Sequence, residues 1–170
     1  MSRGPSPCRI LKDEIVAELF PVIYEIGFAR DDHPLRWFGW DVSTRRYIWE
    51  FRRAPNSKES DLLSIDLVCD YLMVQVNLAR ISNEPQPNAA GTISPAEELG
   101  AAGVPRSLRK QLIRQGRLFG LLDGSYSMPA KKDDRSSNEK CAKALISELC
   151  ADMEYVRAYF DGSNTKGRVR

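Results

Sequence analysis

Apolar and polar residues alternate at every second position in three successive stretches within residues 45–81. Because successive side chains of a strand point to opposite faces, each stretch predicts a strand with one apolar face and one more polar face. The links between them are short, which favours antiparallel pairing. The apolar positions are Tyr47, Trp49 and Phe51, then Leu63, Ile65, Leu67 and Cys69, then Leu72, Val74, Val76 and Leu78.

The two links between these strands predict different turns. The first, residues 54–61, is polar and contains Pro55, Asn56 and Ser57, which is typical of a hairpin loop. The second consists only of Asp70 and Tyr71. Two-residue hairpin turns usually need glycine, so we expect an alternative turn geometry here.

An amphipathic helix is predicted before the strands, from Cys8 to residue 26. Its apolar stripe recurs at three- and four-residue steps, at Leu11, Ile15, Leu19, Val22, Ile23 and Ile26. Pro21 lies inside this pattern and removes one backbone donor, which predicts a kink. Gly27 is expected to end the helix in a left-handed conformation, with Phe28 folding back onto the last turn.

A second helix is predicted at the C-terminal end, over residues 138–160. Ser136 and Glu139 have the spacing of a capping box, and Gly162 is expected to end the helix. Its apolar stripe contains Cys141, Leu145, Leu149, Val156 and Phe160. Asp152 falls at the margin of this stripe and is interpreted as a rim residue.

Together these patterns predict an α+β fold: an antiparallel sheet of three to five strands packed on one face by the N-terminal and C-terminal helices. The length of 170 residues suits one domain. We expect a flexible segment at residues 1–7, one domain at 8–160 and a disordered basic tail at 161–170. The predicted core contains Leu19, Trp49, Ile65, Leu67, Val74, Val76, Leu145 and Leu149.

Two stretches remain open to more than one interpretation. Residues 35–42 contain Trp37, Phe38 and Trp40, and are interpreted as an edge strand in the core or as a ligand surface. Residues 83–103 are irregular, with a short helix expected where Ser94, Pro95 and Glu97 resemble a capping box.

Composition narrows the setting and the cofactors. The formal charge is only +2, which argues against a dominant polyanionic partner. No apolar run approaches 18 residues, so no membrane span is expected, and no secretory signal is visible. None of the four cysteines forms a CxxC pair and His33 is the only histidine, which disfavours zinc. Cys69 is interpreted as a buried thiol, and a reduced cytoplasmic location is expected.

The order of several features resembles a known family. They are Ile26-Gly27-Phe28 at the end of the first helix, Phe51-Arg52-Arg53 at a strand end, the paired strands, and Arg117-Leu118-Phe119-Gly120-Leu121-Leu122 before the last helix. This order resembles the bacterial family catalogued as domain of unknown function 4304. The resemblance implies a small α+β domain without established catalytic residues, of a kind that sometimes occurs among toxin-immunity proteins.

Catalytic motifs give little support to an enzyme. No GxSxG is present, and His33 lies in an expected loop, so a nucleophilic triad has no basis. No glycine-rich phosphate loop is present either. Glu50, Asp66 and Asp70 lie on or near neighbouring strands and could hold Mg²⁺ for phosphodiester cleavage. The other interpretation is a solvated face on which Arg46 and Arg52 pair with the carboxylates.

Residues 105–115 predict a basic amphipathic helix, in which Leu108 and Leu112 share one face. Its cations and the next one along the chain are candidate contacts for an acidic protein or toxin, and less so for nucleic acid. They are Arg106, Arg109, Lys110, Arg114 and Arg117. The favoured function is a non-enzymatic binding protein, with toxin neutralisation as one role and a metal-dependent phosphodiesterase or nuclease as the alternative. No cofactor is expected.

Overall fold

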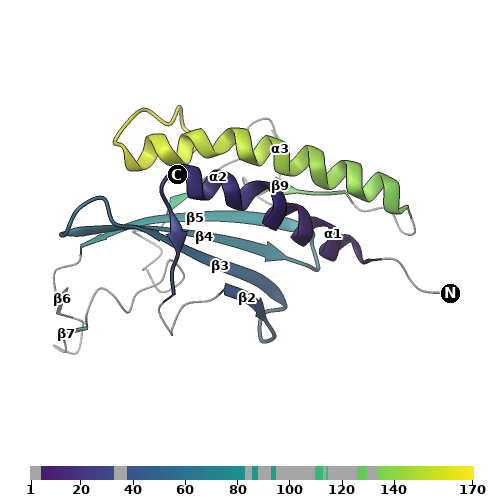
Figure 1. The fold of residues 1–170 in the computed structure, drawn as a ribbon, viewed down its shortest axis with the longest axis horizontal. Helices are drawn as coiled ribbons and strands as arrows, with labels where there is room; N and C mark the ends of the chain where they lie inside the picture. Colours follow the sequence, from purple (N-terminus) through teal and green to yellow (C-terminus); the bar gives the residue numbers. More distant parts are fainter. Residues whose placement is uncertain are drawn as a thin grey trace.

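The structure is a computed structural model that describes residues 5–32, 38–82, 86–87, 93–94, 110–112, 114, 126–129 and 134–170. An antiparallel sheet is covered on one face by helices, as Figure 1 shows. The three longest strands are β3 (Arg46–Arg53), β4 (Glu59–Val68) and β5 (Met73–Ser82). They match the three strands that the alternation predicts, and the α+β prediction is confirmed.

The two edges of this three-stranded centre each carry two short strands. β1 (Ala29–Arg30) and β2 (Phe38–Asp41) both pair with the outer edge of β3. β8 (Lys110–Gln111) and β9 (Tyr126–Ser127) both pair with the outer edge of β5. The sheet is therefore five positions wide, in the order β1-β3-β4-β5-β8. β6 (Gln86–Pro87) and β7 (Ile93–Ser94) form a separate pair.

The turn between β4 and β5 has the unusual geometry that its sequence predicts. It spans four residues, from Cys69 to Leu72, because Val68 pairs directly with Met73. Leu72 has a φ of 48°, in the left-handed region that glycine usually fills. Its backbone carbonyl accepts a hydrogen bond from the Met128 N–H at 3.0 Å. Leu72 therefore belongs to the turn and not to the strand.

The link between β3 and β4 is shorter than predicted. β4 already begins at Glu59, and Asp61 is fully buried in it. The interpretation of residues 54–61 as a hairpin loop is therefore wrong at its last positions. The polar sequence did not indicate a strand there, because the burial of Asp61 depends on its ion pairs with Arg53 and Arg80.

The first helix runs continuously through α1 (Pro7–Glu14), the π-helical segment η1 (Ile15–Leu19) and α2 (Phe20–Glu25). Pro21 predicts a kink; the irregularity takes the form of a widened π turn that ends just before it. The Phe20 N–H donates to the Ile15 carbonyl, five residues back. A wider turn relieves the clash that the proline ring would make with the preceding turn.

Both helices end as their glycines predict. Gly27 has a φ of 90°, and the Phe28 N–H donates to the Ile23 carbonyl at 3.2 Å. This is the Schellman geometry, which satisfies carbonyls that the helix leaves free. Gly162, with a φ of 73°, follows α3 (Arg135–Phe160) in the same way.

The N-terminal cap of α3 differs from the prediction. Asp134 caps the helix, and its carboxylate accepts a hydrogen bond from the Ser137 N–H at 2.9 Å. The Ser136 and Glu139 spacing therefore does not mark the cap. Asp134 and Ser136 are two possible capping residues that lie close together in the sequence, and spacing alone did not distinguish them.

The core lies between the helices and one face of the sheet. Phe20 is its aromatic centre, with ring centroids 5.5 Å from Trp49 and 5.1 Å from Phe51. Phe38 of β2 packs on the same group, which confirms a strand-pairing and core role for this part of residues 35–42. All eight residues predicted for the core are at most 4% exposed.

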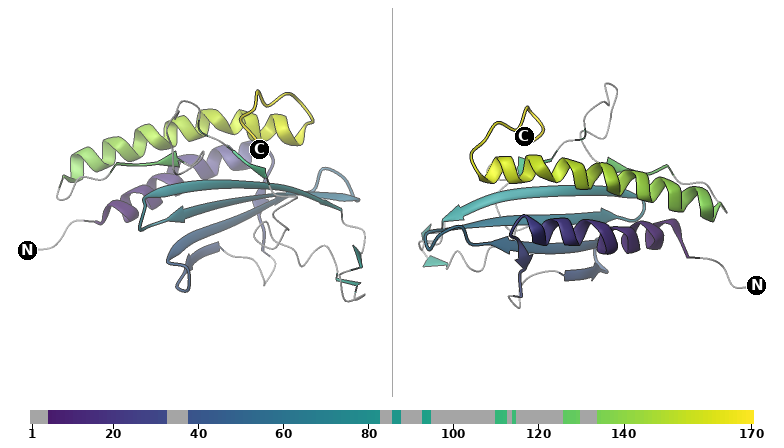
Figure 2. Two further views of the ribbon diagram at one scale, coloured as in Figure 1. Left: turned by 180° about the vertical axis from the view of Figure 1, so that it is seen from behind. Right: turned by 45° about the horizontal axis from the view of Figure 1, so that its top comes forward.

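The two long helices are parallel and adjacent, as the views in Figure 1 and Figure 2 agree. Both begin at the end of the sheet where β4 finishes, and both finish at the end where β4 begins. Their dipoles therefore add: two partly negative C-terminal ends meet at one end of the sheet, and two partly positive N-terminal ends lie at the other.

Cys8 and Cys69 form a disulfide, with their Cα atoms 5.3 Å apart. The interpretation of Cys69 as a buried thiol is therefore wrong. The bond joins the first turn of α1 to the residue after β4. We call this end of the sheet the disulfide end. The opposite end, where Arg53, Asp61 and Arg80 pair in register, is the arginine end.

The C-terminal residues contact the edge of the sheet, and the disordered tail expected for residues 161–170 stays a prediction. Val169 pairs with Leu112, and the Arg170 N–H donates to the Gln111 carbonyl at 3.1 Å. Arg168 is only 8% exposed. The strand edge at Gln111 and Leu112 supplies the backbone partners of these residues, which composition does not indicate.

Candidate functional site

The face of the sheet away from the helices contains a buried polar group of residues. The buried Glu50, Ser64 and Asn77 form one row across three strands, and the exposed Gln111 of β8 extends it. Glu50 and Asp66 are 3% and 8% exposed, and the Ser64 hydroxyl donates a hydrogen bond to the Asp66 carboxylate. Two of the three predicted metal-binding carboxylates therefore share a face, as the alternation indicates, and both are buried and not solvated.

Asp70, the third carboxylate, lies elsewhere. It belongs to the turn after β4, is about half exposed and pairs with Arg45 at 3.4 Å. Among the residues that the structure describes, no group of three or more His, Cys, Asp or Glu side chains has the arrangement of a metal site. The carboxylates predicted for Mg²⁺ are therefore not brought together. Arg52, which the other interpretation pairs with these carboxylates, donates a hydrogen bond from its Nε to the Asp31 carboxylate at 3.1 Å.

The predicted basic helix is not formed where the structure describes it. Lys110 is exposed in strand β8, and Leu112 is buried beside the C-terminal residues. Arg114 makes a two-pronged ion pair with Glu148 of α3, at 2.7 and 2.5 Å. Arg106, Arg109 and Arg117 lie outside the described residues. Of the two described cations, Lys110 lies in a strand, so it does not share a helical face with Arg114.

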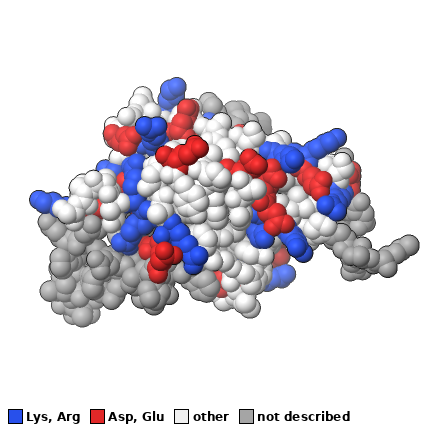
Figure 3. Space-filling view, in the orientation of Figure 1, with Lys and Arg blue, Asp and Glu red and all other residues white. Residues whose placement is uncertain are grey.

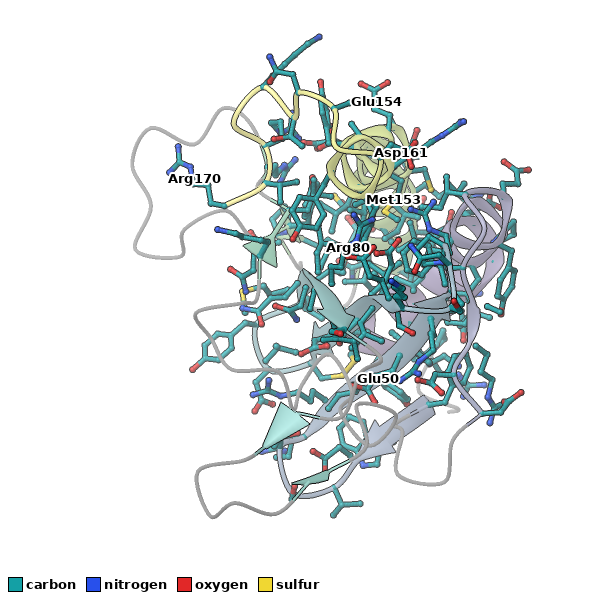
Figure 4. The ribbon with its side chains drawn as sticks, turned by 90° about the vertical axis from the view of Figure 1, so that its left-hand side faces the viewer. Glu50, Arg80, Met153, Glu154, Asp161 and Arg170 are labelled. Atoms are coloured by element: carbon teal, nitrogen blue, oxygen red, sulfur yellow. A yellow bond between two sulfur atoms is a disulfide. The ribbon has the colours of Figure 1, made fainter. Side chains whose placement is uncertain are left out.

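The arginine end is a closed structural network. The fully buried Asp61 carboxylate accepts hydrogen bonds from Arg53 Nε at 3.0 Å and from Arg80 Nε at 2.7 Å. The two arginines also donate to the last carbonyls of the helices: Arg53 to Ile26 and Arg80 to Phe160. Figure 4 looks onto this end, with Arg80 between the sheet and α3, and Glu50 farther from the helices.

A second buried network fixes the C-terminal residues. The Tyr126 hydroxyl donates to Asp152 at 2.6 Å, and Arg168 forms an ion pair with the same carboxylate. Burial, followed by the Asp152 carboxylate, raises the pKa of Tyr126 far above its usual value. The interpretation of Asp152 as a rim residue is therefore wrong. Its partners are distant in the sequence, so helix periodicity could not reveal them.

The disulfide end contains an open cavity of about 600 Å³. The Cys8–Cys69 bond, Ser6, Arg9, Lys12, Trp40 and Tyr47 line it. We call it the disulfide-end cavity. Its walls come from the first turns of α1, from β2 and β3, and from the turn after β4. The pairing of Trp40 with Tyr47 between β2 and β3 puts the two aromatic rings side by side.

The described residues of the cavity walls carry positive charge and aromatic surface, and none of them is a carboxylate. Arg9 is 71% exposed, and Lys12 is 29% exposed. Both approach Asp13, which does not line the cavity, at 3.8 and 2.6 Å. Trp40 is 42% exposed, with its ring centroid 4.9 Å from that of Tyr47.

Two exposed apolar side chains lie on the turns at the same end of the sheet. Val42 is 77% exposed in the turn between β2 and β3, and Tyr71 is 66% exposed in the turn after β4. The ion pair of Arg45 with Asp70 joins these two turns. On the face of the molecule shown in Figure 3, acidic and basic side chains lie close to one another, without a large area of one charge.

Sequence reasoning missed the disulfide-end cavity. One signal was present: Arg9 and Lys12 are three residues apart, which places them on one side of a helix. The closeness of α1 to β2 is a tertiary feature that no local pattern contains.

No family model, curated protein or solved structure matches this chain. The resemblance to the family of unknown function therefore stays a prediction. Within the described residues, the helices are too short or too polar to cross a membrane.

Proposed function

We propose that this chain is a non-catalytic binding protein that recognises an anionic partner at the disulfide-end cavity. One observation carries the proposal: among the described residues that line the cavity, two are cations, two carry aromatic rings and none is a carboxylate. A concave site of this size suits ligand binding, since typical ligand sites measure about 300–1,000 Å³. The function predicted from the sequence is kept, and its site moves from the basic segment to this cavity.

An acidic protein or a toxin is the partner that the sequence favours. Trp, Tyr and Arg dominate the energetically important positions of protein interfaces. Trp40, Tyr47 and Arg9 belong to these types, and the exposed Val42 and Tyr71 could extend the contact beyond the cavity. A toxin-neutralising role follows if the partner is a toxin whose acidic surface this end covers.

The metal-dependent phosphodiesterase remains the alternative. Glu50 and Asp66 share one buried face, which supports part of it. Asp70 is paired with Arg45 on an exposed turn. The carboxylate arrangement therefore gives this alternative less support than the cavity gives to binding.

Titration with anionic probes tests the proposal. We would measure the binding of an acidic Glu- and Tyr-containing peptide and of phosphorylated small molecules by isothermal titration calorimetry. At least one anionic probe is expected to bind, with affinity that falls as salt rises, because exposed charges are screened. The Arg9→Gln/Lys12→Gln variant should lose at least tenfold in affinity.

A charge-matched variant provides the control. Arg157→Gln/Lys143→Gln removes two exposed cations from α3 that do not line the cavity. It should bind like the unchanged protein. The proposal fails if no anionic probe binds, or if the two double variants weaken binding equally. For the toxin role, co-expression with a toxin encoded beside this protein should restore growth, and the cavity variant should not.

A further inference from the structure

We infer that the disulfide-end cavity takes a phosphate monoester carried on a planar aromatic ring. This inference rests on the proposed function and names the ligand class for the same site. The phosphate would lie between Arg9 and Lys12, with the ring against Trp40. The charge of the cavity, the placement of its rings and its limited extent each support this class.

Charge favours a dianion over a single carboxylate. Arg9 and Lys12 bring two positive charges to the cavity wall, and their shared neighbour Asp13 offsets one of them from outside the cavity. The first turn of α1 adds roughly half a positive charge. The remaining positive charge, about 1.5, matches a phosphate monoester, which carries about −1.5 to −2 at neutral pH.

The positions of the two cations also suit a phosphate. They are three residues apart on α1, so both side chains leave the same side of the helix. Arg9 offers a planar group of donors that fits two phosphate oxygens, and Lys12 offers a compact charge. Lys12 is more buried than Arg9, which places one cation deeper than the other.

The aromatic wall is held in place from behind. Tyr47 stacks on the buried Trp49, with centroids 5.5 Å apart and planes only 9° from parallel. Trp40 packs at an angle of 59° to Tyr47 and keeps 42% of its surface exposed. A fixed, partly exposed indole is the surface on which planar rings stack in nucleotide-binding proteins.

The extent of the cavity favours a small ligand or one modified side chain over a long polyanion. Its volume of about 600 Å³ falls within the usual range for small-molecule sites. The whole chain has 25 lysines and arginines and 23 aspartates and glutamates, so an extended acidic strand would meet nearly as many anions as cations.

The test compares complete ligands with their parts. The oxidised protein would be titrated by calorimetry with adenosine 5′-monophosphate and with phosphotyrosine, two sources of the same chemistry. Adenosine, tyrosine, inorganic phosphate and an unphosphorylated acidic peptide serve as partial ligands. At least one ring-bearing phosphate should bind tenfold or more tightly than each of its parts, and the one that binds identifies the source.

Variants assign the two halves of the ligand. Trp40→Ala should weaken the ring-bearing phosphate at least tenfold, whereas Trp40→Phe should retain most of the binding. Arg9→Gln/Lys12→Gln should abolish it, and Arg157→Gln/Lys143→Gln should leave it unchanged. Circular dichroism would check that each variant folds, and amide chemical shifts of residues 6–12 would locate the ligand.

The outcomes separate this inference from the proposed function. Binding of the acidic peptide without either ring-bearing phosphate overturns the inference and leaves the binding function in place. Inorganic phosphate that binds as tightly as the complete ligands also overturns it, because the ring would then contribute nothing. The absence of binding by any anionic probe overturns both.

Discussion

Replacing the Cys8–Cys69 disulfide by serines should destabilise the protein substantially. The bond closes a loop with a sequence separation of 61 residues and joins the start of α1 to the end of β4. Without it, the unfolded chain gains the conformational entropy that the closed loop removes. Both cysteines are partly exposed, so the lost packing is a smaller effect.

The loop length sets the magnitude. For a loop of about 60 residues, the entropic relation gives an upper value of about 4 kcal/mol at 25 °C, and measured effects are typically about 2–4 kcal/mol. For a protein of this length, 1 kcal/mol corresponds to a Tm change of about 2–4 °C. We therefore expect the Cys8→Ser/Cys69→Ser variant to melt roughly 5–15 °C below the parent protein.

Two assays check this prediction. Thiol titration of the denatured, non-reduced protein should find two thiols, from Cys141 and Cys150, and four after reduction. Guanidinium unfolding should give a lower midpoint for the double variant, and a reducing agent should lower the midpoint of the parent alone. Four thiols before reduction, or identical midpoints, would show that the bond does not form or does not stabilise the fold.

Three further predictions concern the core, the arginine end and a thiol. Leu145→Ala should cost about 2–5 kcal/mol in chemical denaturation, because the side chain is 4% exposed, and a cost below about 1 kcal/mol would contradict its core position. Asp61→Ala should cost about 3–5 kcal/mol, because it takes from Arg53 and Arg80 the buried carboxylate that both pair with, and a change under 1 kcal/mol would refute a structural role. Burial, then Glu18 and Glu14, raises the pKa of Cys150 to about 11, so its alkylation at pH 8 should be much slower than that of an unfolded thiol. Equal alkylation rates in the folded and unfolded protein would be inconsistent with this shift. Since the folded pKa lies above the unfolded value of 9.0, the stability that is linked to this thiol should be lost as pH rises from about 9 to about 11.

Local patterns predicted the elements whose causes are local. Alternation located β3, β4 and β5, since every second side chain of a strand faces the same side. Gly27 and Gly162 marked the two helix ends because left-handed backbone favours glycine. The face of the sheet that carries Trp49, Ile65 and Val76 was predicted for the same reason, and so the core was correct.

Features that depend on distant partners were not predictable in this way. The disulfide joins cysteines 61 residues apart, and neither has a local signature of pairing. Arg168 is buried because it forms an ion pair with Asp152 and donates a hydrogen bond to the Tyr126 hydroxyl, although its sequence context is that of a basic tail. The expected cytoplasmic location stays a prediction, but it no longer has support from reduced cysteines, because disulfides are rare in that compartment.

The two ends of the sheet are held to the helices by different interactions: ion pairs and hydrogen bonds at one end, and a disulfide at the other. The parallel helices place both C-terminal ends at the arginine end, where Arg53 and Arg80 donate to helix carbonyls and to the buried Asp61. Because these arginines pair with Asp61 and with helix carbonyls, a role in stability accounts for the charges at this end. At the disulfide end, a covalent bond holds α1 to the sheet and no buried ion pair is needed for that purpose. Within the described part of the chain, Arg9 and Lys12 form ion pairs with the exposed Asp13, and Trp40 keeps part of its ring in solvent. Under the proposed function, the cations at the disulfide end bind a ligand, whereas the charges at the arginine end serve stability.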